Sequence, residues 1–123
     1  MQFDVVIIGA GPSGLFSAFQ AGMLGMKSAI VDALEVIGGQ CAALYPEKPI
    51  YDIPAYPQIL GQDLVNKLFE QASPFSPKYF LSEQVIGLEE HDGLFNLTTS
   101  MGTMLQAKVV IIAAGAGAFG PNR

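Results

Sequence analysis

Apolar residues in the first third of the chain fall into two short runs separated by a helical stripe. Residues 3–8 form a β-branched run that is typical of a strand buried in a parallel sheet, and the run stops at Gly9. From Pro12 onward, apolar residues recur at helical spacing, and proline suits a first helical turn, where its missing N–H would have no partner. Residues 28–32 form the second run. The pattern predicts a strand, a helix and a parallel strand.

A membrane-spanning helix is the alternative for this region, because residues 5–26 carry no charge and reach the length of about 20 residues that a span needs. The sequence Gly-x-Gly-Pro would interrupt such a helix near its middle. No Lys or Arg precedes the stretch, and Asp4 stands where a signal peptide needs positive charge. We therefore interpret the stretch as a strand, a turn and a helix.

The middle of the chain predicts a long irregular connection followed by a helix. No period holds between Gly38 and Gly61, and the prolines in this stretch each remove a backbone donor. Connections of this size are uncommon in compact domains and are more often functional than idle. Helical spacing returns over residues 62–73, and Pro74 ends it.

The last third predicts antiparallel strands at 85–90, 94–99 and 104–107, and then a separate buried strand at 108–114. Asp92-Gly93 favours a two-residue hairpin turn because both positions accept positive φ, and Met101-Gly102 offers a second turn. The predicted fold class is α/β, with a parallel sheet and a small antiparallel β-meander.

Composition limits the classes of partner. Half of the residues are apolar, 14% are charged against about 25% in ordinary domains, and the net charge is −5. So few charges leave part of a small domain's surface to be covered by something else. The few basic residues are scattered, which argues against nucleic acid and against a polybasic membrane anchor. The single cysteine, Cys41, excludes an internal disulfide and a cysteine-based zinc site, and fits a reducing cytoplasm.

Residues 9–14 read GAGPSG, the G-x-G-x-x-G pattern, with a predicted strand before it and a helix after it. Gly9 permits a tight turn, Gly11 lets the backbone approach a pyrophosphate, and Gly14 lets helix and strand pack closely. The helix N-terminus, with Ser13 in its first turn, offers N–H groups to phosphates. The alternative is a glycine-rich turn without a ligand, but the flanking elements favour a Rossmann-type FAD/NAD(P)-binding domain.

Asp32 ends the second predicted strand, where an acidic side chain accepts hydrogen bonds from the ribose hydroxyls of a dinucleotide. The alternative is an ordinary surface carboxylate. A carboxylate here repels a 2′-phosphate, so the site should hold FAD or NAD rather than NADP. A second literal match to the glycine pattern, at residues 115–120, has no helix after it, and we interpret it as a false positive.

The long connection opens with features suited to a flat ligand. Gly39, the second of two adjacent glycines, allows close backbone approach, and the Gln40 amide both donates and accepts. Tyr45, Tyr51 and Tyr56 lie in the same proline-stiffened stretch, and one of them can stack on a ring system. For Tyr51 and Tyr56 we favour the alternative, that they attach the loop to the domain surface.

Three stretches together carry a specific resemblance: VVIIGAGPSGLF, GGQCAALYPEKPIYDIP and VVIIAAGAGAF. They look like the FAD domain of the thioredoxin-reductase-like ferredoxin–NADP reductases, over essentially the whole chain. The resemblance implies FAD as cofactor, electron transfer between NADP(H) and ferredoxin or a similar small carrier, and a homodimer.

The resemblance also implies roles for individual residues. Asp32 falls on the adenosine ribose, Gln40 near the flavin or its ribityl chain, and Tyr45 on the face of the isoalloxazine ring. Ile86, with Val85 beside it, falls in the segment whose backbone meets adenine. In the same way, Phe119 falls in the segment that returns to the flavin. The family often has Glu where this chain has Asp32, which is shorter by one methylene.

Members of the family are more than twice this length and carry a separate NADP-binding domain. We therefore expect residues 1–123 to be the N-terminal segment of an FAD-binding domain, inactive alone, with no catalytic or metal-binding residue of its own. Two alternatives stay open. One is a thioredoxin reductase, whose CxxC would lie in the absent domain, although the LYPEK and YDIP segments argue against it. The other is a non-catalytic dinucleotide-binding module.

Other polar candidates are weaker. Cys41 has no partner cysteine and reads as a small loop side chain. We expect His91, beside the hairpin turn, to face solvent without an acid partner. Glu89 and Glu90 are strand neighbours that point to opposite faces, so they form no catalytic pair.

Overall fold

In the computed structural model of the chain, residues 1–35, 37, 49–50 and 59–113 are described. Their main feature is a six-stranded sheet in the order β5-β2-β1-β8-β7-β6. Strands β5, β2, β1 and β8 run parallel, and β7 and β6 continue the sheet antiparallel. The predicted α/β class, with a parallel sheet and an antiparallel meander, is confirmed. The strand bounds are β1 (Gln2–Ile8), β2 (Ser28–Val31), β5 (Lys78–Phe80), β6 (Val85–His91), β7 (Leu94–Thr99) and β8 (Met104–Ile112).

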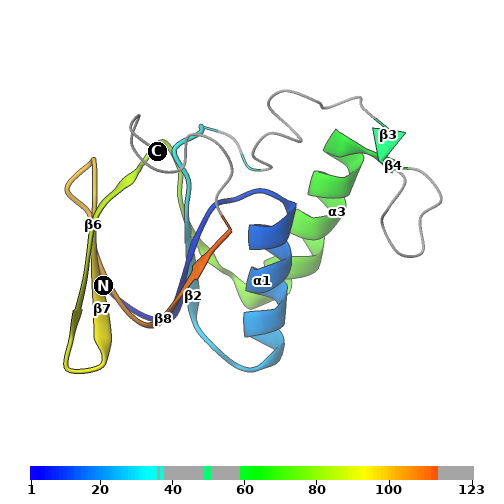
Figure 1. Ribbon diagram of the computed structural model, residues 1–123. Coiled ribbons are helices and arrows are strands. Elements are labelled where there is room, and N and C mark those ends of the chain that lie inside the picture. Colours follow the sequence, from blue (N-terminus) through cyan, green and yellow to red (C-terminus); the bar gives the residue numbers. More distant parts are fainter. Residues whose placement is uncertain (36, 38–48, 51–58, 114–123) are drawn as a thin grey trace.

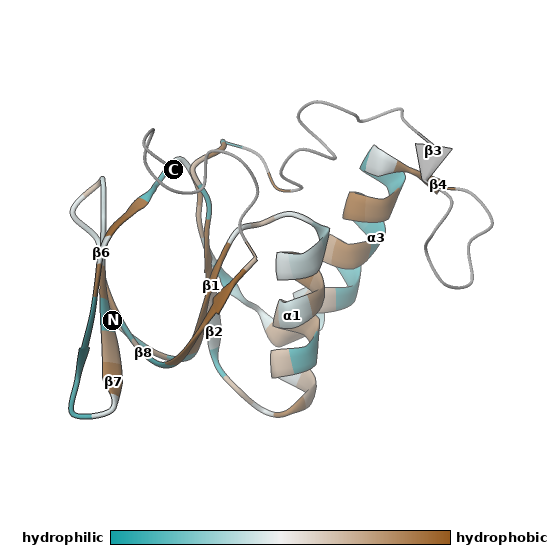
Figure 2. Ribbon diagram, in the orientation of Figure 1, coloured by the Kyte–Doolittle hydropathy of each residue, from teal (hydrophilic) through white to brown (hydrophobic). Residues whose placement is uncertain are grey.

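Two helices cover one face of the parallel strands, and the antiparallel β6–β7 hairpin packs over their other face (Figure 1). Helices α1 (Pro12–Met23) and α3 (Gly61–Ala72) lie side by side, and a single 3-10 turn, η1 (Ser73–Phe75), follows α3. Because side chains alternate along β1, Ile7 packs toward the helices and Ile8 toward the hairpin. Figure 2 shows the result, with brown apolar residues along β1, β2 and β7.

Strand β8 differs from the prediction. We expected a meander strand at 104–107 and a separate closing strand at 108–114, but Met104–Ile112 is one continuous strand. Its first half pairs antiparallel with β7, through Leu97 and Leu105, and its second half pairs parallel with β1, through Ile8 and Ile112. No turn interrupts residues 104–112, and Gln106 and Ala107 pair with β7 on one edge and with β1 on the other. The meander and the parallel sheet are therefore one sheet.

Two further elements were not predicted. Strand β5 has three residues, too short for a periodic pattern, and it follows Ser76, whose φ of 50° is left-handed. The irregular connection contains a small antiparallel pair, β3 (Pro49–Ile50) with β4 (Ile59–Leu60). The two predicted turns are confirmed, since Asp92 (φ 54°), Gly93 (φ 80°) and Gly102 (φ 80°) all have positive φ.

The uncharged stretch 5–26 folds as strand, turn and helix, as predicted. Among the described residues, no helix is both long enough and apolar enough to cross a membrane.

Candidate functional site

The glycine-rich turn joins β1 to α1 at the carboxyl end of the parallel strands, where α/β sheets bind ligands. Gly9 has a φ of 118°, a conformation that favours glycine. A Cβ atom on Gly14 would overlap the carbonyl oxygen of Gly9, so only glycine lets α1 approach the end of β1 this closely. The mechanical roles predicted for Gly9 and Gly14 are confirmed. Gly11 has an ordinary φ of −75°, so its predicted approach to a pyrophosphate stays a prediction.

The first turn of α1 is suited to an anion. Gly11 is its N-cap, no side chain among the described residues caps the turn, and no acidic residue lies in it. The side chain of Ser13 is exposed, while its carbonyl accepts the hydroxyl of Ser17 at 2.9 Å. A helix start without a side-chain cap presents its N–H groups, and the positive end of the helix dipole, to a phosphate.

Asp32 directly follows β2, which ends one residue earlier than predicted. Its side chain lies close to the glycine-rich turn and is not a surface carboxylate, since Asp32 is only 7% exposed. Oδ2 accepts the backbone N–H of Ala10 at 2.6 Å, and Oδ1 accepts that of Leu34 at 2.8 Å. A carboxylate has about four acceptor positions, so each oxygen keeps capacity for a ligand hydroxyl. The surface alternative is therefore wrong, and the ribose role stays a prediction.

The connection between β5 and β6 passes beside Asp32. The N–H of Asp32 donates to the carbonyl of Phe80 at 3.0 Å, and its carbonyl accepts the N–H of Glu83 at 3.0 Å. The register of β6 on β7 shifts between Val85 and Gly87, a bulge that takes Ile86 out of the ladder.

Val85 is buried at 7% exposure and Ile86 is 66% exposed. The structure therefore brings the residues predicted for the adenine segment to the same end of the sheet as Asp32 and the glycine-rich turn. The hydrogen bonds that link these segments join residues far apart in sequence, and no sequence signal indicated them.

Several predicted positions lie outside the described residues, namely Gly39, Gln40, Cys41, Tyr45, Tyr51, Tyr56, Phe119 and the second glycine pattern at 115–120. Within the described part of the chain, no group of three or more His, Cys, Asp or Glu residues could hold a metal ion.

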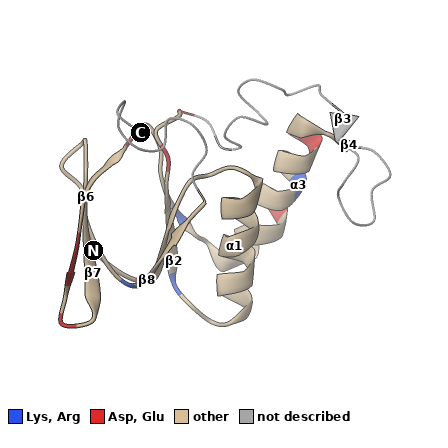
Figure 3. Ribbon diagram, viewed as in Figure 1, with Lys and Arg blue, Asp and Glu red and all other residues tan. Residues whose placement is uncertain are grey.

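The hairpin tip holds the remaining titratable candidates. The side chain of His91 is 81% exposed, as expected, but our expectation that it has no acid partner is wrong: its Nε2 lies 3.5 Å from Oδ2 of Asp92. Both groups are open to solvent, so the pair has little energetic weight. Glu89 and Glu90 are exposed on β6, and Figure 3 shows acidic residues along this strand in red.

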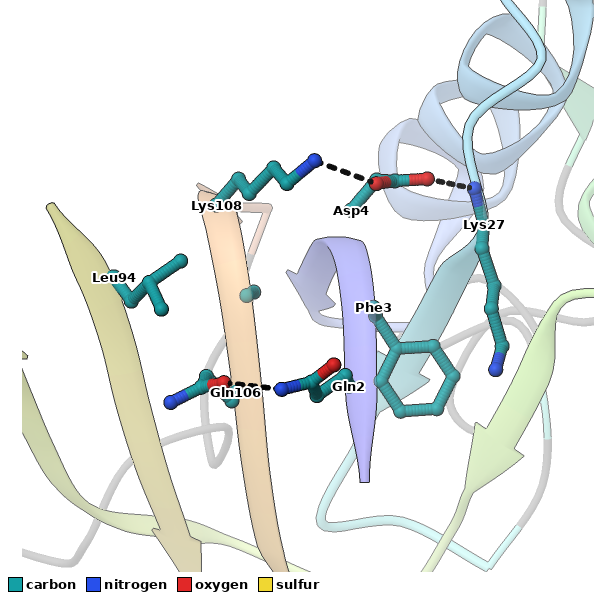
Figure 4. Close-up of a pocket in the computed structure, with 8 residues that line it drawn as sticks. Gln2, Phe3, Asp4, Lys27, Leu94, Gln106 and Lys108 are labelled. Carbon is teal, nitrogen blue, oxygen red and sulfur yellow. Dashed lines mark hydrogen bonds and ion pairs between the residues drawn. The ribbon is translucent and has the colours of Figure 1, made fainter.

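A cavity of about 300 Å³ lies at the opposite end of the sheet (Figure 4). Within it, Oδ2 of Asp4 accepts the backbone N–H of Lys27 at 2.8 Å, and Oδ1 lies 3.6 Å from Nζ of Lys108. The hydrogen bond from Lys27 is the main cause that lowers the pKa of Asp4. The Lys27 ammonium lies 5.1 Å from the ring centroid of Phe3. Since the Asp4 carboxylate already pairs with Lys108 and the cavity lies at the amino end of the strands, we assign the cavity no ligand.

Comparison with known proteins decides the family. Residues 3–123 match the family described as "Pyridine nucleotide-disulphide oxidoreductase". The chain belongs to this family. Within it, the chain is 62% identical over 120 residues to the ferredoxin–NADP reductase of Rickettsia rickettsii, covering 98% of this chain and 35% of that protein. It is 59% identical over 121 residues to the ferredoxin–NADP reductase of Anaplasma phagocytophilum, covering 98% and 36%.

Solved thioredoxin reductase structures share the fold. Thioredoxin reductase from Streptococcus pyogenes superimposes with a TM-score of 0.81 at 29% identity, over 93% of this chain and 35% of that one. Thioredoxin reductase from Lactococcus lactis gives a TM-score of 0.79 at 29% identity, over 92% and 35%. The chain thus spans about a third of the length of the relatives that it matches.

Proposed function

We propose that this chain is the N-terminal, FAD-binding part of a ferredoxin–NADP reductase. The observation that carries the proposal is its identity of 62%, over 98% of the chain, to a protein of that name. The solved thioredoxin reductases are 29% identical, which makes thioredoxin the less favoured electron acceptor. The chain matches only 35% of that relative's length. This supports placing the NADP-binding domain of the full-length protein outside residues 1–123.

The described residues fit the adenosine and pyrophosphate half of FAD. The start of α1 and the glycine-rich turn would bind the pyrophosphate. Gly9 and Gly14 lie in close backbone contact and have no side chains, so backbone occupies this part of the turn. The helix N-terminus offers its N–H groups to the phosphates. Asp32 would accept ribose hydroxyls, and its carboxylate disfavours a 2′-phosphate. Val85 and Ile86 would meet adenine beside the bulge.

The flavin half would be held by residues outside the described part, namely Gly39, Gln40, Tyr45 and Phe119. A bound flavin supplies hydride acceptance and single-electron release. The chain's own residues bind the cofactor, orient it and shield it from water. NADPH and ferredoxin are the proposed partners, and a homodimer in the cytoplasm is the proposed setting.

The test uses the full-length gene product. We expect it to copurify with FAD, identified by chromatography of the released flavin, and to catalyse NADPH-dependent reduction of ferredoxin. The control reaction replaces ferredoxin with oxidised thioredoxin, which should not be reduced. Reduction of thioredoxin alone would indicate the thioredoxin reductase alternative. A bound dinucleotide without any reductase activity would indicate a non-catalytic module.

A further inference from the structure

A polar cluster formed by Glu83, Thr99 and Thr103 lies next to the loop that carries Asp32. The hydroxyl of Thr99 donates to Oε1 of Glu83 at 2.6 Å, and the hydroxyl of Thr103 donates to the same oxygen at 2.7 Å. Thr99 is 1% exposed, and its Oγ1 also accepts the N–H of Thr103 at 3.2 Å. The cluster therefore attaches the Glu83 side chain to the turn between β7 and β8.

The backbone of Glu83 points the other way, toward Asp32. Its N–H donates to the carbonyl of Asp32 at 3.0 Å, while the N–H of Ser82 donates to the carbonyl of Leu34 at 2.9 Å. Ser82 has a φ of 59°, a left-handed conformation that a serine keeps only where its surroundings hold it. Glu83 thus lies between the turn at 100–103 and the loop that carries the Asp32 carboxylate.

The same attachment extends to the bulge of β6. Gln84 donates its N–H to Oγ of Ser100 at 3.0 Å and accepts the N–H of Ser100 at 2.8 Å. Val85 follows in register with Thr99, and the register shift comes next. The position of Ile86 relative to Asp32 is therefore determined by the short connection that Glu83 anchors.

We propose that Glu83 is a positioning residue for the adenosine end of the dinucleotide. By accepting two threonine hydroxyls, it holds residues 82–84 in the conformation that presents Asp32 and Ile86 to one ligand. This inference rests on the proposed function, because it takes the adenosine to lie between these two residues.

The geometry assigns Glu83 the role of a hydrogen-bond acceptor, with no requirement for its negative charge. Both hydroxyls donate to one oxygen, and an amide oxygen also has two lone pairs. Glu83→Gln should therefore preserve the attachment, whereas Glu83→Ala removes it. This pair of variants separates the acceptor from the charge.

The experiment uses the full-length protein freed of its flavin, and ADP and riboflavin 5′-phosphate as probes of the two halves of the cofactor. Titration calorimetry gives the Kd of each. We expect Glu83→Ala to raise the Kd for ADP about tenfold and Glu83→Gln to raise it less than about threefold. The Kd for riboflavin 5′-phosphate should not change in either variant.

Thr103→Val and Thr103→Ser provide a second test if Glu83→Ala does not fold. The valine variant loses one donor and should weaken ADP binding about threefold, while the serine variant keeps the hydroxyl and should bind like wild type.

Wild-type affinity for ADP in both Glu83→Ala and Thr103→Val would overturn the inference. An equal loss for both probes, together with a lower melting temperature, would overturn it in favour of a general stabilising role. If the unmodified protein binds neither probe, the proposed function itself is wrong, and no comparison of variants is needed to see it.

Discussion

Oδ2 of Asp32 accepts the backbone N–H of Ala10 at 2.6 Å, so the end of β2 and the glycine-rich turn are held together by one carboxylate. Its other oxygen accepts the N–H of Leu34. The two segments that would bind ribose and pyrophosphate therefore have a fixed relative position before any ligand arrives. An Asp at this position thus has a structural task as well as the predicted ribose contact.

Asp32→Asn should weaken both functions. An asparagine has one acceptor oxygen, so its NH₂ group must face the N–H of either Ala10 or Leu34. We expect the free energy of unfolding to fall by about 1–3 kcal/mol and ADP to bind about tenfold more weakly. Urea unfolding and calorimetry measure the two effects. The control is Glu35→Gln at an exposed neighbouring position, which should leave both values unchanged.

Gly14→Ala should destabilise the fold, because the added methyl group would overlap the carbonyl oxygen of Gly9, and backbone does not move aside cheaply. We expect the free energy of unfolding to fall by about 1–3 kcal/mol. Gly87→Ala is the matched control, since its new methyl group would come no closer than 3.7 Å to Thr98. Equal stability of the two variants would show that α1 does not pack as described.

Tyr79→Phe should stabilise the protein. The Tyr79 hydroxyl is buried and has no hydrogen-bond partner within the described part of the chain, and this burial raises its pKa. Removing a hydroxyl that has no partner among the described residues, while keeping the ring beside Phe69, should add about 1 kcal/mol to the unfolding free energy. Urea unfolding measures the change, and a loss of stability would indicate that the hydroxyl has a partner after all.

Asp4 should make stability depend on pH in the acid range. Its pKa is lowered on folding, mainly by the N–H of Lys27 and also by Lys108. A carboxyl with a lowered folded pKa contributes stability that is full above its unfolded value, about 3.9, and is lost as the pH falls through the folded value. Asp4→Asn keeps an acceptor but loses the charge. The difference in urea midpoint between wild type and Asp4→Asn should therefore shrink as the pH falls below about 4. A constant difference would contradict this.

Tyr45→Ala in the full-length protein should shift the visible absorption band of the flavin and weaken its retention, if Tyr45 stacks on the isoalloxazine ring as the resemblance implies. Tyr51→Ala serves as the control, because we expect that residue only to attach the loop to the surface. An unchanged spectrum with full flavin occupancy in the Tyr45 variant would remove it from the stacking role.

Local patterns predicted much of the fold. The run at 3–8, the helical stripe from Pro12 and the Asp92-Gly93 turn all became the expected elements, because each depends on neighbours within a few residues. The glycine pattern was equally informative, since Gly9 and Gly14 each answer a local steric demand. The sequence did not predict β5 or the continuity of β8, because both depend on pairing with strands distant in sequence, β5 with β2 and β8 with β1.

By itself the sequence determined the family, the βαβ unit and the identity of the carboxylate at the end of β2. Only the tertiary structure decided that this carboxylate is buried against Ala10, and that Glu83 links its loop to Thr99 and Thr103. These hydrogen bonds join residues 16 to 22 positions apart. No periodicity encodes such contacts, since they form only when the sheet brings distant strand ends together.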